Sequence, residues 1–369
     1  ATAYYLAKNH SIKNIAVLDK GWLGGGNTGR NTQIIRSNYF WPQSAAFFNH
    51  SLKLYEQLSQ ELNFNVMLSQ RGILTLAHSQ HELEGIRRWA NAIKINDVDA
   101  EVLTPFDVKK LVPMINLDCR FPIHGGFIQH RGGISRHDAV AWGYARAASA
   151  YGIDIIQQCE VTGFNIQSGR VTGVNTTRGT IGADRISIAV AGHTSELAKM
   201  AGFRVPVTSM QLQAMVSEPI KPCLNTVVTS SVIHVYVSQS DRGELVFGGG
   251  ADVYNSYAQR GGIALLQENV AALLELLPAF SRLRLMRQWA GITDITPDTS
   301  PLMGHTPVQN LYISGGWGTG GYKAIPAGGD TMAYTIANDQ PHPLIEDFGL
   351  ERFKSGRLID EGAASGVAH

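Results

Sequence analysis

The sequence predicts an α/β fold, in which a parallel sheet flanked by helices is interrupted by a second, α+β domain with a mostly antiparallel sheet. Three observations predict it. An apolar strand after a helix ends in Asp19, a buried strand at 186–191 ends in Gly192 before a helix start, and a strand at 311–313 opens into a glycine-rich loop. Alternating hydrophobicity between 205 and 250 predicts the antiparallel sheet.

The glycine-rich loop is the most informative segment. Five glycines lie within the seven residues 315–321, and an Ala/Gly-rich helix follows. Glycine lets backbone N–H groups approach a planar or anionic ligand, and a helix N-terminus adds a favourable partial charge. A tight loop that closes a sheet would explain two of these glycines. We therefore expect Gly318, Gly320 and Gly321 to face a ligand, beside Lys323, the long cation of this loop.

Length and composition exclude several classes of protein. The 369 residues correspond to roughly two domains. A net charge of +1 without runs of like charge argues against a nucleic-acid groove, and no stretch of about 18 apolar residues could span a membrane. Cys119, Cys159 and Cys223 are odd in number and widely spaced, so they indicate neither a disulfide framework nor a metal site. A reduced, cytoplasmic setting fits best.

The first residues predict half of a dinucleotide-binding unit. Residues 1–8 read as a helix already under way, and the apolar strand 14–18 ends in Asp19, followed by Lys20. In such units an acid about 20 residues beyond the glycine-rich turn holds the ribose hydroxyls. Counting back from Asp19 places that turn before Ala1, so we expect the given chain to lack its first strand and its glycine fingerprint. Helix, strand and Asp also occur together by chance in many α/β proteins.

The loop at 24–36 is a second candidate ligand loop. It is rich in Gly, Asn and Thr and leads into an apolar pair followed by Arg36. Such a loop can surround the phosphates and ring of a ligand, which makes Gly25, Asn31 and Thr32 candidate contacts. Arg36 supplies a forked donor suited to a carboxylate. A solvated arginine beside a flexible loop is the alternative.

A third candidate lies at a predicted helix start. The turn-rich segment 125–138 leads into a helix that Ser135 or Asp138 could cap. His137 would then sit where positive potential favours neutral imidazole, the form that can act as a nucleophile. A lone histidine at a helix start is usually a surface or capping residue, so that alternative stays open.

The remaining pattern supplies the frame. Helices are predicted at 44–62, 81–96 and 262–285, strands at 72–77, 153–161 and 171–179, and a polar tail after 338. The aromatic residues Phe47, Phe48 and Tyr55 are expected in the core rather than at a cofactor.

Separated motifs carry a resemblance to a known family. Residues 17–21, 31–36, 296–304 and 315–323 resemble the D-amino-acid oxidase and monomeric sarcosine oxidase family of flavin amine oxidases. The β subunits of heterotetrameric sarcosine oxidases are more similar still, and the motifs that they share with this chain are 20–27, 69–72, 136–146, 216–222 and 236–241. The resemblance covers nearly the whole chain.

This resemblance implies two flavins. Non-covalent FAD would occupy the Rossmann-like domain, and FMN would be joined covalently to the histidine that matches His137. The family's carboxylate-binding residues match Arg36 and Lys323, which we expect to be catalytic, and Asp19 matches the ribose-binding acid. The sequence departs from monomeric relatives at Gln33, where they carry arginine. The expected cofactor-binding set is Asp19, Lys20, Gly25, Asn31, Thr32, His137, Val161, Gly192, Gly318, Gly320, Gly321 and Lys323.

The resemblance also implies an activity and an assembly. Sarcosine would be demethylated to glycine, with formaldehyde or methylene-tetrahydrofolate and hydrogen peroxide, through amine oxidation at FAD and electron transfer to FMN and then oxygen. Partners would be α, γ and δ subunits, with tetrahydrofolate on one of them. Dimethylglycine or proline as substrate, or an inactive flavin-binding subunit, are the alternatives. We expect FAD-binding segments at 1–42, 128–204 and 286–345, substrate-domain segments at 43–127 and 205–285, and a tail at 346–369.

Overall fold

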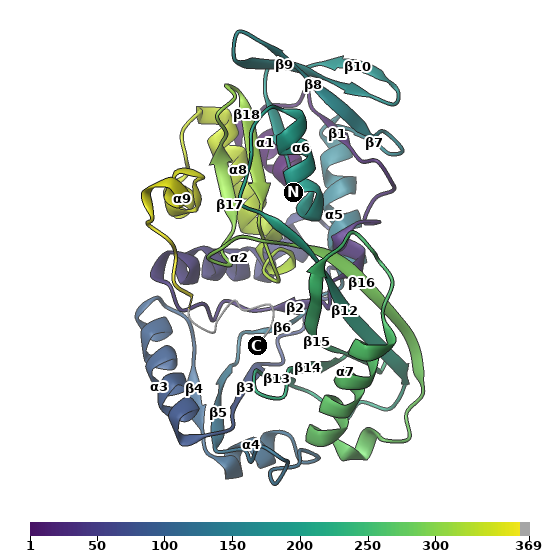
Figure 1. Ribbon diagram of the computed structural model, residues 1–369, viewed down its shortest axis with the longest axis vertical. Coiled ribbons are helices and arrows are strands. Elements are labelled where there is room, and N and C mark those ends of the chain that lie inside the picture. Colours follow the sequence, from purple (N-terminus) through teal and green to yellow (C-terminus); the bar gives the residue numbers. More distant parts are fainter. Residues whose placement is uncertain (362–369) are drawn as a thin grey trace.

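The structure is a computed structural model that describes residues 1–361, apart from the side chain of Val253. It has an upper and a lower part, with helix α2 (Pro42–Glu61) running between them (Figure 1). Strands and helices occur in both parts, and the predicted α/β class is confirmed.

The upper part contains short parallel pairings. Strand β1 (Ala16–Leu18) pairs with β7 (Asp154–Ile156), and β11 (Ile186–Ile188) pairs with β18 (Leu311–Gly315), which also carries antiparallel β17 (Leu302–His305). An antiparallel meander adds β8 (Val161–Gln167), β9 (Arg170–Thr176) and β10 (Gly179–Gly182). The helices here are α1 (Thr2–His10), α5 (His137–Ala150), α6 (Thr194–Met200) and α8 (Ile325–Asn338). A first strand before Ala1 stays a prediction.

The lower part is built on an eight-stranded sheet in the order β16-β12-β15-β14-β13-β3-β5-β4. Its strands are β16 (Leu285–Ile295), β12 (Thr208–Pro219), β15 (Glu244–Asn255), β14 (Val235–Gln239), β13 (Val227–Ser230), β3 (Ile73–Ala77), β5 (Gly125–Gln129) and β4 (Glu101–Leu103). Only β13 and β3 run parallel, as the alternating pattern led us to expect of a mostly antiparallel sheet. The helices α3 (Gln80–Ile95), α4 (Pro105–Leu111) and α7 (Ile263–Leu276) belong to this part.

The sheet extends past the expected domain boundaries. Strand β16 pairs with β12 up to Ile295, and β5 pairs with β3 up to Gln129. Residues 128–129 and 286–295, which we assigned to FAD-binding segments, therefore belong to the large sheet. Elsewhere the division into domains stays a prediction.

Helix α2 packs against the apolar core of the upper part. Proline 42 occupies its first turn, where the missing N–H costs no helical hydrogen bond. Its aromatic residues Phe47, Phe48 and Tyr55 are 0%, 2% and 1% exposed and pack in the largest apolar cluster, which includes residues of α8. The expectation that these rings are core is confirmed.

The chain after α8 is folded against the upper part. A 3-10 helix (Pro343–Phe348) and α9 (Glu351–Ser355) follow, and Phe348 is fully buried. Arg352 donates to both carboxylate oxygens of Asp298, at 2.7 and 3.0 Å, and to the carbonyl of Ser300 at 2.9 Å. The expected polar tail is thus packed up to residue 361, because apolar residues and one buried ion pair fix it. Residues 362–369 lie outside the described part.

Arg352→Met should lower the free energy of unfolding by about 3–5 kcal/mol, because it leaves the buried Asp298 carboxylate without its cation. Lys354→Met removes an exposed pair with Glu351 and should cost about 0–1 kcal/mol. Urea unfolding of both variants measures the difference. Equal losses would show that the buried pair does not anchor this segment.

Candidate functional site

A cavity of about 470 Å³ lies where the two parts meet. Segments from both parts line it, and they come from 27–38, 212–214, 229–236, 249–250, 291–294 and 317–325. Far-apart stretches of sequence, including both arginine-bearing and lysine-bearing candidate loops, therefore converge on one space.

The glycine-rich loop forms one wall of the cavity. After β18 the chain turns with positive φ at Gly316 (65°) and Gly318 (51°), a conformation that favours glycine. Asp294, at the end of β16, fixes this turn: its Oδ2 accepts from Gly316 N at 2.6 Å, and its carbonyl accepts from Gly318 N at 2.8 Å. The loop's backbone is thus tied to the large sheet.

Lys323 follows this loop and is 6% exposed. Its Nζ donates to the carbonyl of Thr319 at 2.8 Å. Burial, and then the charge of Arg36, hold the pKa of Lys323 well below its usual value. A carboxylate in the cavity would stabilise the charged amine.

Arg36 reaches the same cavity from the opposite loop. Its Nη1 donates to Asn38 Oδ1 at 2.8 Å, and its guanidinium lies 4.5 Å from the centre of the Tyr39 ring. The Tyr39 ring stacks in turn on Phe48 at 3.7 Å. Two cationic side chains on one cavity make it suited to an anionic group.

Asp294 is the buried acid of the cavity wall and was not among the expected residues. It is 1% exposed, and burial raises the pKa of its carboxyl to about 7, although backbone N–H donors of Trp317 and Gly316 act in the opposite direction. The neighbouring Thr293 Oγ1 is buried and has no hydrogen-bond partner within residues 1–361. The wall therefore carries a polar atom that a ligand could satisfy.

Comparisons with known proteins identify the family. The family model described as FAD dependent oxidoreductase (DAO) matches residues 1–335. The chain belongs to this family of FAD dependent oxidoreductases. It is 54% identical to sarcosine oxidase subunit beta of Rhodobacter capsulatus, over 100% of this chain and 89% of that protein. It is 55% identical to sarcosine oxidase subunit beta of Arthrobacter sp., over 100% and 92%.

A solved structure supports the same assignment. L-proline dehydrogenase from P. horikoshii is similar with a TM-score of 0.91 and 25% identity, over 97% of this chain and 95% of that one. The resemblance read from the sequence motifs is confirmed by these findings.

The residues present fit a flavin of this FAD dependent oxidoreductase family. The cavity is lined by backbone of the glycine-rich loop, by Asn31 and Thr32 of the second ligand loop, and by the unsatisfied Thr293 hydroxyl. Backbone N–H groups, amides and hydroxyls are the donors and acceptors that suit the polar edge of a flavin ring.

The structure brings six of the expected residues to this cavity and leaves the others outside. Those that line it are Asn31, Thr32, Arg36, Gly318, Gly321 and Lys323. Those that do not are Asp19, Lys20, Gly25, His137, Val161, Gly192 and Gly320. The cofactor and catalytic roles of both groups stay predictions.

Local contacts account for several residues of the second group. Asp19 Oδ1 accepts from Gly21 N at 2.7 Å, and Lys20 Nζ lies 3.3 Å from His193 Nε2. A Cβ at Gly192 would meet Ile292 Cγ2 at 2.2 Å, so close packing on β16 requires glycine there. The carbonyl of Gly25 accepts a hydrogen bond from Arg30. Val161 is the first residue of β8. A Cβ at Gly320 would meet the Tyr39 hydroxyl.

His137 begins α5, away from the cavity. Its side chain is half-buried, and burial lowers the pKa of its imidazole. Nδ1 is buried and has no hydrogen-bond partner in the described part of the chain. Two residues earlier, the carbonyl of Ser135 accepts from the Tyr322 hydroxyl at 2.9 Å, which links the start of α5 to the loop that carries Lys323.

Sequence reasoning missed several residues on the cavity. Trp89, His234, Tyr236 and Asp294 line it from α3, the 230–234 turn, β14 and β16. Burial raises the pKa of Tyr236 to about 12. No local signal distinguished Trp89, His234 or Tyr236, because aromatic and polar residues are common in helices, turns and strands. For Asp294, an acid inside a buried strand was a usable signal.

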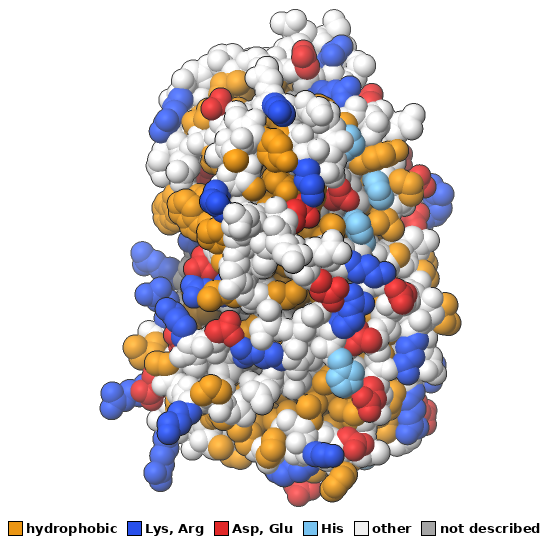
Figure 2. Space-filling model, turned by 180° about the vertical axis from the view of Figure 1, so that it is seen from behind, with side chains coloured by type: hydrophobic (Ala, Val, Ile, Leu, Met, Phe, Trp, Pro, Cys, Tyr) orange, Lys and Arg blue, Asp and Glu red, His pale blue; other side chains and the backbone are white. Residues whose placement is uncertain are grey.

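The surface adds little to the functional assignment. Lys and Arg side chains are interspersed with Asp and Glu over most of the face in Figure 2. Within residues 1–361, no helix is long and apolar enough to cross a membrane, and no group of three or more His, Cys, Asp or Glu could hold a metal ion.

Asp294→Asn should change how stability depends on pH. Because the carboxyl has a pKa of about 7 when folded and 3.8 in the unfolded chain, the flavin-free protein should lose stability as pH rises from about 4 to about 7. The amide does not ionise, so this fall should be absent from the variant. Urea unfolding of both proteins at about pH 5 and about pH 8 measures it. Identical pH profiles would contradict a buried, protonated Asp294.

Proposed function

We propose that this chain is the amine-oxidising β subunit of a sarcosine oxidase. The observation that carries the proposal is that Arg36 and Lys323 share one largely apolar-walled cavity beside the glycine-rich loop. Sarcosine presents one carboxylate, which two cations can bind, and one amine. The names of the relatives described above support this choice of substrate.

The proposed mechanism assigns binding and orientation to the chain. Arg36 and Lys323 hold the substrate carboxylate through charge-assisted hydrogen bonds, so that the amine and its N-methyl carbon lie at a fixed position. FAD, when bound, supplies the acceptor for the hydride equivalent that leaves this carbon. The carboxylate also stabilises the ammonium form of Lys323, which burial otherwise disfavours.

The proposed products follow from the chemistry of the substrate. Loss of two electrons and two protons from the neutral amine of sarcosine gives an imine, which water cleaves to glycine and formaldehyde. In the presence of tetrahydrofolate on a partner subunit, the one-carbon unit is captured as methylene-tetrahydrofolate instead. Oxygen accepts the two electrons and two protons and becomes hydrogen peroxide.

The proposal includes a second flavin at His137. The buried Nδ1 without a partner in residues 1–361, and the burial that favours neutral imidazole, support covalent attachment of FMN there. Arg136 and Asp138 form an ion pair beside it, with Nη2 and Oδ2 2.5 Å apart.

The proposed assembly is hetero-oligomeric and cytoplasmic. The word subunit in the names of the relatives supports partner chains, which we assign as α, γ and δ. Cys119, Cys159 and Cys223 are free, which agrees with a reducing compartment.

Proline and dimethylglycine are the competing substrates. The structural likeness to L-proline dehydrogenase favours including proline in a comparison. Rates measured with the three amines at equal flavin loading separate them. Anaerobic bleaching of the flavin by sarcosine would exclude an inactive flavin-binding subunit.

Arg36→Ala and Lys323→Ala should each weaken apparent sarcosine affinity by about 1.5–3 kcal/mol, the scale of a hydrogen bond to a charged group. Steady-state kinetics of the flavin-loaded oxidase measure the change. Lys53→Ala is the control, because Lys53 pairs with Asp97 on the exposed surface. Unchanged kinetics in both cavity variants would remove the carboxylate-binding pair from the mechanism.

His137→Ala should abolish covalent flavin, because no other residue is proposed to form the bond. Acid-precipitated wild-type oxidase should keep flavin fluorescence that maps by mass spectrometry to the peptide around His137. The control is His130→Ala, which alters a histidine paired with Glu101 at the surface. Fluorescence retained in His137→Ala would place the attachment elsewhere.

A further inference from the structure

We propose that Gln129 and Asn38 are positioning residues that hold Arg36 ready to bind the substrate carboxylate. This inference rests on the proposed function, since it assigns a task to residues that surround the carboxylate-binding arginine. Neither residue has an expected role in the sequence motifs.

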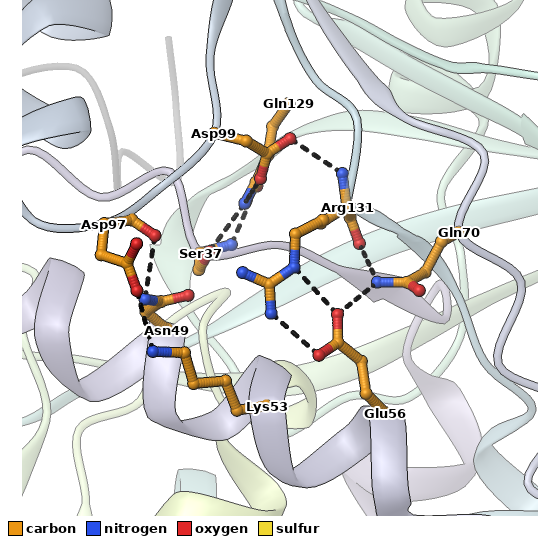
Figure 3. Close-up of polar contacts among 9 residues, drawn as sticks. All are labelled: Ser37, Asn49, Lys53, Glu56, Gln70, Asp97, Asp99, Gln129 and Arg131. Atoms are coloured by element: carbon orange, nitrogen blue, oxygen red, sulfur yellow. Dashed lines mark hydrogen bonds and ion pairs between the residues drawn. The ribbon is translucent and has the colours of Figure 1, made fainter.

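Gln129 holds the residue that follows Arg36. It ends β5 and is fully buried, as is Ser37. The Gln129 Oε1 accepts from Ser37 N at 3.0 Å, and its Nε2 donates to Ser37 Oγ at 2.7 Å. One side-chain amide therefore fixes both the backbone and the side chain of Ser37 (Figure 3).

A polar network orients the Gln129 amide in turn. Asp99 Oδ1 lies 3.5 Å from Gln129 Nε2, and Asp99 Oδ2 accepts from Arg131 N at 2.9 Å. Arg131 forms a two-pronged pair with Glu56 of α2, at 2.9 and 2.8 Å. Gln70 lies at the outer end of this network, where it donates to Glu56 and to the Arg131 carbonyl, both at 2.8 Å, and the bonds that join Glu56, Arg131, Asp99 and Gln129 do not involve it (Figure 3).

Asn38 acts on the guanidinium itself. It is 1% exposed, and its Oδ1 accepts from Arg36 Nη1 at 2.8 Å. The Trp89 indole donates to the Asn38 carbonyl at 3.1 Å. The bond from Trp89 thus fixes the backbone of Asn38, whose side chain contacts Arg36.

The chain before Arg36 is also fixed. Strand β2 (Ile34–Ile35) pairs with β6 (Gly133–Ile134), and Ser135 N donates to the Gln33 carbonyl at 3.0 Å. An arginine side chain loses rotamer freedom when it is immobilised, which opposes binding. Contacts that fix Arg36 before the ligand arrives remove part of that cost from the binding step.

A purely structural role of Gln129 and Asn38 predicts a different result. Loss of a buried hydrogen bond would lower stability and affect every ligand alike. A positioning role weakens binding of a carboxylate while binding of a neutral molecule of the same size is unchanged. Acetate and acetamide are such a pair of probes.

The test compares Gln129→Met with Gln70→Met in the flavin-loaded oxidase. The two substitutions are the same and both remove amide contacts of this network, but Gln70 contacts none of residues 36–38 in the hydrogen bonds described. Ser37→Ala is a milder variant that removes one bond to Gln129, and Asn38→Ala removes the contact with Arg36. Calorimetry gives the dissociation constants of acetate and acetamide, kinetics give KM and kcat for sarcosine, and thermal melting checks folding.

Gln129→Met, Ser37→Ala and Asn38→Ala should each weaken acetate binding and raise KM about three- to tenfold, the effect of one lost hydrogen bond. Affinity for acetamide should not change, kcat should stay within about twofold, and Gln70→Met should match the wild type. Unchanged acetate affinity in the folded variants overturns the inference, as does an equal loss for acetamide or in Gln70→Met.

Arg36→Ala separates this inference from the proposed function. If Arg36→Ala weakens acetate binding while Gln129→Met, Ser37→Ala and Asn38→Ala do not, the positioning role is wrong and the carboxylate-binding role stands. If Arg36→Ala itself leaves acetate binding unchanged, both are wrong.

Discussion

The burial of a lysine beside an arginine is the constraint on which the site depends. Lys323 is almost inaccessible to water, and Arg36, on the same cavity, further disfavours its charged form. The acid on this cavity wall, Asp294, directs its carboxylate to the N–H of Gly316. Burial and the charge of Arg36 disfavour the ammonium form of Lys323, and a bound anion would favour that form. The cavity is therefore suited to a ligand with a carboxylate.

Helix α2 explains how two loops more than 280 residues apart in sequence hold Arg36 and Lys323 at fixed positions on one cavity. Ser51 donates to the Lys323 carbonyl and Tyr55 to the Tyr322 carbonyl, both at 2.7 Å. Glu56, the residue after Tyr55, pairs with Arg131 and so begins the network that ends at Ser37 (Figure 3). One rigid helix thus contacts the supports of both Lys323 and Arg36. Loops fixed to a common element can present a preorganised pair of charges.

The parts of this site that could be predicted are those whose chemistry is visible in residue type alone. Clustered glycines and a single lysine indicated the loop at 315–323, and the position of Arg36 after an apolar pair indicated that arginine. Gln129 carries no such signal, since it is one polar residue inside an ordinary strand and acquires its role from partners distant in sequence. For Asp294 the sequence shows an acid inside a buried strand, but not its contacts with Gly316 and Gly318. The packed segment up to residue 361 was missed for the same reason: Arg352 is unremarkable until Asp298 lies opposite.

If Arg36 and Lys323 bind the substrate carboxylate as proposed, discrimination among amines falls to the opposite wall of the cavity. Every amino acid offers the same carboxylate to Arg36 and Lys323, so these residues cannot distinguish sarcosine from proline. Tyr236 and the 230–234 turn line the cavity from the large sheet, and a Cβ at Gly249 would meet the His234 carbonyl at 1.8 Å. Glycine at that position is what lets the turn lie against β15. Backbone packing therefore sets the shape of this wall, and we expect selectivity among N-alkyl amino acids to depend on the space that it leaves in the cavity.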